Sequence, residues 1–361
     1  MRVFKLLLRV ILPLAMSGLF IWLSLRHTDV RAVGAAIAAA DPLRLLGYAL
    51  ILVVIHVLRT VRWGILLEPL GHVGFKRLNS ASAVGFMLLI LLPLRLGEFA
   101  RPLLIARPPP GVGVRLSRSG ALASIVVERI VDGICIGVLG MIALRLLGSS
   151  ASGVYLVFAR RASVLVALGF FGLCLALVFA FLFRERALAL ARTLLTPLSP
   201  KLAARANEVL EAFISALHLG SGWKLLGFFV LTFAYWGLNG VGLGLLAPAF
   251  GFTNLTPLMI ATILTIQVVG VMVPAGPGMV GTMQFFTQAG LSLFVAGALT
   301  DPAVGARAAG FANTVWMLQF GMSVLLGLIF LFVGHVSLKG LFGSSAAEEK
   351  LPGAAAAVAA P

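Results

Sequence analysis

The sequence is short of cysteine, histidine and acidic residues. Its 361 residues include two cysteines, five histidines and only 12 Asp and Glu. Cys135 and Cys174 lie in apolar runs, so neither a disulfide framework nor a thiolate metal site is expected. The chain has no HExxH motif and no Walker loop. The sequence therefore predicts no metal, no cofactor and no catalytic residue, and we do not expect an enzyme.

Charge of either sign is also scarce. Charged residues make up 11% of the chain, apolar residues make up 60%, and the mean hydropathy is +1.08. A soluble domain of this size needs more polar residues to cover its surface. The excess of 28 Lys and Arg is typical of cytoplasmic loops held at anionic lipid headgroups, so no nucleic-acid partner is expected. The composition predicts an all-α polytopic membrane protein.

Long apolar runs are what the chain does have. A helix needs about 20 apolar residues to cross a bilayer. The first run follows Arg2 and Lys5, and we interpret it as an uncleaved helix because it is long and further runs follow. Segment 29–40 is short enough to lie along the interface. Six full spans are predicted, at about 6–25, 43–67, 120–143, 163–183, 223–247 and 305–333.

Two further apolar stretches are interrupted. Stretch 78–105 is broken at 92–98, and stretch 257–299 is broken at 273–281, in each case by Pro and Gly. Lipid cannot hydrogen-bond the backbone groups that such a break frees, so a break persists only inside protein or beside a wet cavity. We therefore interpret both stretches as re-entrant helical hairpins.

The distribution of basic residues tests this topology. With both termini cytoplasmic, 18 of the 28 Lys and Arg lie inside, seven lie outside and three lie within spans. This split agrees with the positive-inside rule. The rule alone does not separate a re-entrant hairpin from two full spans, because only the short break would change sides.

The layout is symmetric. Each half has two spans, a hairpin and a further span, and both breaks carry Pro-x-x-x-Gly, at 93–97 and 277–281. Inverted repeats whose broken helices meet near the midplane are a transporter design, and the breaks indicate the binding site. We predict one membrane domain, 1–343. The domain consists of repeat one at about 5–145 and repeat two at about 160–335, with a cytoplasmic amphipathic linker at about 184–222. A disordered tail, 344–361, follows the domain.

Charged residues within membrane segments are costly, so they are functional candidates. Three segments each carry a set of charged residues. Together these sets contain more arginines than acidic residues. Arg binds phosphate with paired donors, so the cluster suits a phosphate. The candidates are Arg59 and Arg62; Arg95, Glu98 and Arg101; and Glu128, Arg129 and Asp132.

Structural interpretations compete with this role. Arg59 and Arg62 would extend toward the cytoplasmic headgroups, and Glu128, Arg129 and Asp132 would pair with one another and lock helices together. In the second hairpin, glutamines would bond backbone groups freed by the break. The candidates there are Gln267, Pro274, Gly276, Pro277, Gly278, Gly281 and Gln284.

Four motifs in order give the chain a family resemblance. They are Arg-x-x-Arg-Trp at 59–63, Leu-Pro-Leu-Arg-Leu-Gly-Glu-x-x-Arg at 92–101, Glu-Arg-x-x-Asp at 128–132 and Pro-Ala-Gly-Pro-Gly-x-x-Gly at 274–281. Over about 5–335 the chain resembles the lysylphosphatidylglycerol synthase transmembrane family, the flippase-like domain also found in the multiple peptide resistance factor. It carries Gln284 where the family's second hairpin usually has an acidic residue. Nothing after Gly343 is expected to fold as the soluble synthase domain.

The resemblance implies a bacterial or archaeal inner-membrane protein that moves lipids between leaflets. The lipid would be a phospholipid or a polyprenyl-phosphate-linked lipid, with its phosphate on Arg95, Arg101 and Arg59 or Arg62. An alternative is a non-transporting subunit that scaffolds a lipid- or glycan-modifying enzyme, and such an enzyme or a second copy of the chain is a further candidate partner. A third is an intramembrane transferase with Glu128 or Asp132 as base, for which the sequence offers no nucleophile.

Overall fold

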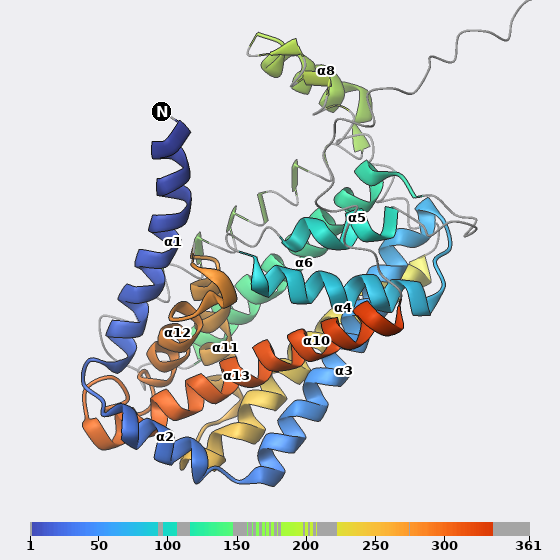
Figure 1. Ribbon diagram of the computed structural model, residues 1–361. Coiled ribbons are helices and arrows are strands. Elements are labelled where there is room, and N and C mark those ends of the chain that lie inside the picture. The colour runs from blue at the N-terminus through green and yellow to red at the C-terminus, as the bar shows by residue number, and fades with distance from the viewer. Residues whose placement is uncertain are drawn as a thin grey trace, which may run out of the picture.

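The protein is all-helical in the part that the computed structural model describes (Figure 1). This part comprises residues 2–92, 97–106, 116–146, 182–197, 222–273 and 275–334, with scattered positions between 157 and 207. The α-helices are α1 (Arg2–Leu25), α2 (Val30–Ala38), α3 (Pro42–Leu67), α4 (Phe75–Leu91), α5 (Ala100–Ala106), α6 (Arg118–Leu146), α8 (Arg184–Leu195), α10 (Gly222–Leu246), α11 (Pro257–Val271), α12 (Thr282–Leu291) and α13 (Pro302–Val333).

Several helices have the length and composition of membrane spans. Among the described residues, Pro42–Leu70, Gly222–Phe250 and Pro302–Val333 are long and apolar enough to cross a bilayer. Residues Ile11–Leu25 reach that length only with Val30–Ala38, from which they are bent by 78°. These findings confirm an integral membrane protein with several apolar helices. Ten of the 21 residues of the predicted span 163–183 lie outside the described residues, so the number of full spans stays a prediction.

Two hairpins of helices stand where the sequence predicts breaks. Helix α4 packs on α5, and α11 packs on α12. Helices α5 and α12, with seven and ten residues, rise only about 10 and 15 Å. The hydrocarbon core is about 30 Å thick, so neither helix crosses it alone.

Glycine shapes the second break. Gly278 and Gly281 have φ of +72° and +87°, in the region that favours glycine. A Cβ on Gly281 would lie 2.4 Å from the Ser17 carbonyl oxygen of α1. Ser17 Oγ also accepts a hydrogen bond of 2.9 Å from the Gly276 backbone N–H. The break is therefore fitted closely against α1.

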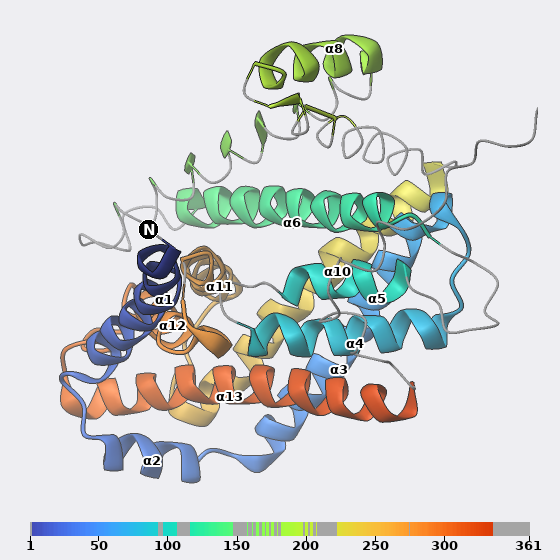
Figure 2. The ribbon, with the colours of Figure 1, turned by 45° about the horizontal axis from the view of Figure 1, so that its top comes forward.

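The helices pair across the two halves of the chain. Helix α3 packs on α10, α4 on α13, and α6 on α11, while α2 packs on α13 and α1 on α12. Figure 2 shows α6, α5, α4 and α13 side by side in that order. The largest apolar core joins α3, α10, α11 and α13 and includes Tyr48, Leu243, Ile263 and Phe311. Residues from both halves thus build one core.

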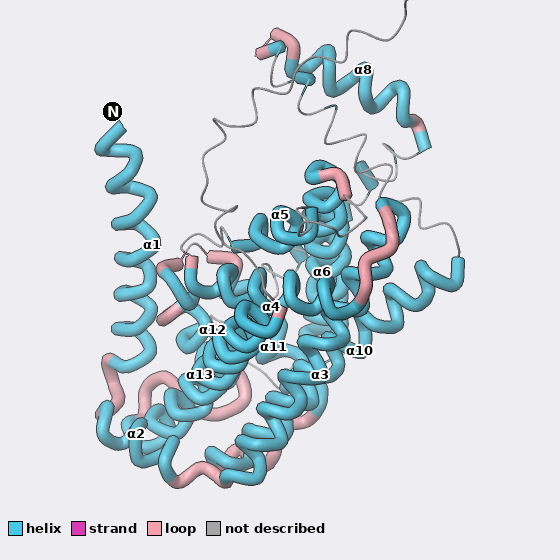
Figure 3. Tube along the Cα trace, turned by 45° about the vertical axis from the view of Figure 1, so that its right-hand side comes forward, coloured by secondary structure: helices cyan, strands magenta, loops and turns pink. Residues whose placement is uncertain are grey.

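The beginning of the predicted linker is helical. Helix α8 lies at the periphery, apart from the helices that build the core (Figure 3). It carries Arg184, Arg186 and Arg192 with exposed Leu190 and Leu194, as expected of an amphipathic segment. Residues 208–221 of the linker and the predicted tail 344–361 lie outside the described residues.

Candidate functional site

A fully buried guanidinium lies at the centre of the charged cluster. Arg62 of α3 has no exposed surface. Its Nη2 donates to Glu128 Oε1 at 2.7 Å, and its Nη1 donates to Asp132 Oδ1 at 2.6 Å and to Thr232 Oγ1 at 3.3 Å. Glu128 and Asp132 present both carboxylates to it because they lie one turn apart on α6. The sequence left open whether Arg62 extends toward the cytoplasmic headgroups. The structure shows that it does not, because its guanidinium is paired inside the protein.

Two more arginines complete this cluster. Arg101 of α5 donates through Nη1 to Glu128 Oε2 at 3.1 Å. Arg129 Nη2 lies 3.1 Å from Glu128 Oε1 and 3.4 Å from Asp132 Oδ2. Glu128, which is also fully buried, thus contacts three guanidinium groups. The cluster joins α3, α5 and α6, with a contact to α10 through Thr232, so it holds the first hairpin to the spans around it.

Arg59 has a different environment, one turn before Arg62. Its guanidinium carbon lies 3.7 Å from the ring centroid of Phe86 and 5.5 Å from that of Tyr235. In the part of the chain that the structure describes, no carboxylate pairs with it and its Nε has no hydrogen-bond partner. Aromatic faces compensate a cation only in part. Arg59 therefore retains the capacity to bind an anion.

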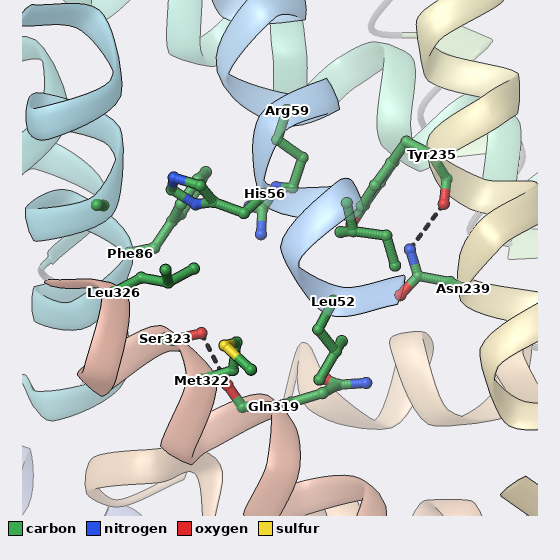
Figure 4. Close-up of a pocket in the computed structure, with 12 residues that line it drawn as sticks. Leu52, His56, Arg59, Phe86, Tyr235, Asn239, Gln319, Met322, Ser323 and Leu326 are labelled. Carbon is green, nitrogen blue, oxygen red and sulfur yellow. Dashed lines mark hydrogen bonds between the residues drawn. The ribbon is translucent and has the colours of Figure 1, made fainter. Parts of the chain in front are cut away.

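A cavity of about 100 Å³ lies beside Arg59. Figure 4 shows its wall: Arg59 comes from α3, Asn239 from α10, and Gln319 and Ser323 from α13, with Phe86 of α4 closing the side. The cavity thus lies where helices of the two halves meet. It combines one cation with amide, hydroxyl and imidazole groups at a depth where polar groups are rare.

The polar side chains around the cavity are held in place by partners. His56 Nε2 donates to Asn79 Oδ1 at 2.9 Å. Gln319 Nε2 donates to the Tyr48 hydroxyl at 2.8 Å. The sequence prediction omitted His56, Asn239, Gln319 and Ser323. His56 lies one turn before Arg59, and Asn239 and Gln319 are polar residues within apolar spans, a signal that was available.

The end of α4 lies against the second break. Leu92 of the first break and Val273, Gly276 and Met279 of the second line a common cavity of about 120 Å³, and α4 contacts the short 3₁₀ turn Pro277–Met279. The Gly278 carbonyl accepts a hydrogen bond of 2.7 Å from Trp316 Nε1 of α13. The second break therefore lies beside Leu92, where the first break begins.

The remaining candidates have structural contacts or lie outside the description. Gln284 Oε1 accepts a hydrogen bond of 2.8 Å from the Gly281 N–H, so it bonds a backbone group at the break. Gln267 is buried, and within the described residues its Nε2 has no partner. Glu98 is half-buried in the 3₁₀ turn 97–99 that precedes α5. Arg95 and Pro274 lie outside the described residues.

These features define a helical integral membrane protein with two broken hairpins, a buried charge cluster and a polar cavity between its halves. Residues 10–327 match the family model of the lysylphosphatidylglycerol synthase TM region. The chain belongs to this family, which confirms the resemblance seen in its motifs. Membership indicates a lipid-related, flippase-like membrane domain. No curated protein and no solved structure matches the chain.

Proposed function

We propose that this protein moves a phosphate-bearing lipid between the leaflets of a bacterial or archaeal inner membrane, and that it is a transporter and not an enzyme. The headgroup phosphate binds Arg59 in the cavity between α3, α4, α10 and α13. The observation that carries the proposal is Arg59 itself, a cation that lines this cavity and has no carboxylate partner among the described residues. Both termini lie in the cytoplasm, as the basic residues favour.

The charge balance favours an anion at this place. Arg62, Arg101 and Arg129 are neutralised in part by Glu128 and Asp132. With Arg59 the cluster has four guanidinium groups, and with Glu98 it has three carboxylates. The positive charges are therefore in excess by one. A buried net positive charge is costly, and a phosphate offsets it with charge-assisted hydrogen bonds. The paired arginines then hold the helices, while Arg59 meets the lipid.

The helix pairing supports an inverted repeat with re-entrant hairpins. In this arrangement α3 corresponds to α10, the hairpin α4–α5 to α11–α12, and α6 to α13. If the two halves are exchanged, the contact between α4 and α13 becomes the contact between α11 and α6, and both contacts are present. The contact between α3 and α10 is unchanged by the exchange. A substrate cavity where the halves meet is the usual design of such transporters.

The test is lipid movement in reconstituted liposomes with Arg59→Gln. Phosphatidylglycerol that carries a fluorescent chain is placed in both leaflets, and a membrane-impermeant quencher reports exchange. The wild-type protein should move the lipid, and Arg59→Gln should slow it because the phosphate loses its counter-charge. Arg31→Gln is the matched control, since Arg31 is an exposed arginine on α2, away from the cavity.

Three results would contradict the proposal. Equal rates of lipid exchange for the wild-type protein and Arg59→Gln would show that the phosphate does not bind Arg59 in this cavity. No movement by the wild-type protein would instead favour the scaffold, and a new lipid mass in the vesicles would favour the transferase.

A further inference from the structure

A second, apolar hollow lies on the other side of α10. It is a groove of about 640 Å³ between α6, α10 and α11, of the size of pockets that hold small organic ligands. Its walls include Val138 of α6, Phe233 and Trp236 of α10, and Ile260 of α11. Cys135 is the one residue in its lining that is not hydrocarbon, aromatic or glycine. The groove therefore suits a hydrocarbon better than a charged headgroup.

The groove opens toward the lipid. Phe233 is 64% exposed and Ile142 is 51% exposed, and these side chains flank the groove on α10 and α6. Both helices fall within predicted membrane spans, 120–143 and 223–247, so we expect hydrocarbon at the mouth of the groove. Lipid is thus the molecule with access to the groove.

Glycines keep the groove open. Gly237, Gly240 and Gly244 of α10 line it. A Cβ on Gly237 would meet nothing within 4 Å, and a Cβ on Gly240 or Gly244 would meet only Ile260, at 3.9 Å. Gly240-x-x-x-Gly244 has the spacing of a helix-packing motif, in which small residues let a neighbouring helix approach closely. Here the glycines leave space instead.

We infer that this groove binds one acyl chain of a bilayer glycerophospholipid. Along α10 it extends from Phe229 to Gly244, which is about 22 Å of helix rise. One leaflet of hydrocarbon is about 15 Å thick, so a fatty acyl chain fits along the groove, whereas a polyprenyl chain extends well beyond it. The site is separate from the Arg59 cavity, because Tyr235 lines that cavity and its neighbour Trp236 lines the groove. The inference goes beyond the proposed function, since a bound chain does not require lipid movement.

The experiment is photolabelling of the reconstituted full chain. The probe is phosphatidylcholine with a diazirine in the middle of one acyl chain, diluted in phosphatidylcholine vesicles, and labelled peptides are located by mass spectrometry. We expect labelling on α6 and α10 at the groove to exceed that on the apolar, exposed face of α13, where Leu325 and Phe332 meet bulk lipid. A resident chain spends longer beside its wall than a passing lipid does.

Filling the groove is the second arm. Gly237→Leu or Gly240→Leu places a side chain in the hollow, and leucine favours a helix more than glycine does. Labelling at the groove should fall to the level on α13. Gly321→Leu is the matched control, because Gly321 is an exposed glycine of α13 with nothing within 4 Å of its Cβ position.

The outcomes separate this inference from the proposed function. Equal labelling of the groove and of α13 in the wild-type protein overturns the acyl-chain site, whether or not the variants fold. Undiminished labelling of a folded Gly237→Leu protein also overturns it. Neither result bears on lipid movement, which the Arg59→Gln assay measures separately.

Discussion

At the scale of single residues, Arg59 and Arg62 lie one turn apart on the same helix and meet opposite environments. Arg62 Nη1 and Nη2 contact two carboxylates in a dry interior, while Arg59 lies on aromatic rings beside a cavity. Two chemically identical side chains are thereby given separate tasks. One stabilises the contact between helices, and the other is available to a ligand.

Glu128→Gln should be strongly destabilising. The change removes the charge that three guanidinium groups share and leaves Arg62 and Arg101 buried without it. Breaking a buried ion pair from one side costs about 3–5 kcal/mol. Thermal unfolding in detergent measures the loss. Asp132→Asn is the control and should cost less, because Asp132 contacts two arginines and is slightly exposed. A smaller loss for Glu128→Gln than for Asp132→Asn would show that Glu128 does not hold the cluster.

The sequence predicted which residues are charged at membrane depth, and it offered the pairing of Glu128 and Asp132 with Arg129, which the structure contains. It did not predict that Arg62 and Arg101 join them. Arg62 and Glu128 are 66 positions apart, and Arg101 and Glu128 are 27 apart. Hydrophobic periodicity defines the buried face of each helix, yet it carries no information on which helix lies opposite. The polar lining of the Arg59 cavity was missed for the same reason, since His56, Asn239 and Gln319 come from three different helices.

At the scale of elements, the three helices that are long and apolar enough to cross a bilayer were predictable to within a few residues. The expected spans 43–67 and 223–247 correspond to Pro42–Leu67 and Gly222–Leu246. Helix α13 begins three residues before the expected 305, because Asp301 accepts hydrogen bonds from two backbone N–H groups and Pro302 stands in the first turn. Apolar length locates a helix in the membrane, while the capping residues decide where it starts.

Gly281→Ala should loosen the second hairpin. Gly281 has a φ of +87°, and an added Cβ would lie 2.4 Å from the Ser17 carbonyl oxygen. Backbone strain of this kind costs about 1–3 kcal/mol, and the contact with α1 adds to it. A lowered unfolding temperature should result. Gly18→Ala on α1 is the control, since its Cβ would meet nothing within 4 Å. An equal effect of the two changes would mean that the break does not depend on close contact with α1.

At the scale of the whole molecule, the two halves meet at their breaks and at the cavity beside Arg59. Each half supplies a hairpin to the other: α4 packs on α13, and α11 packs on α6. A movement of one hairpin therefore changes the contacts of the opposite half. This coupling is what a protein needs if it exposes one site to two leaflets in turn.

A cross-link between the breaks should stop lipid movement. Leu92→Cys and Val273→Cys place thiols on the two walls of the common cavity, in a background with Cys135→Ser and Cys174→Ser. A short bismaleimide should join them and arrest exchange in liposomes, because the hairpins can no longer separate. Each single cysteine variant, treated alike, is the control and should stay active. Full exchange by the cross-linked protein would show that the breaks do not move apart during transport.

The spacing of the charge cluster along the chain also has a consequence for synthesis. Arg62 leaves the ribosome 66 residues before Glu128. At about 5–20 residues per second, this interval lasts about 3–13 s. During that time the Arg62 guanidinium on α3 has no carboxylate partner on α6. Placing an unpaired charge in hydrocarbon costs free energy. We therefore expect Arg62 to stay in contact with water or headgroups until α6 arrives, so that α3 settles into its final place only after α6 has been made.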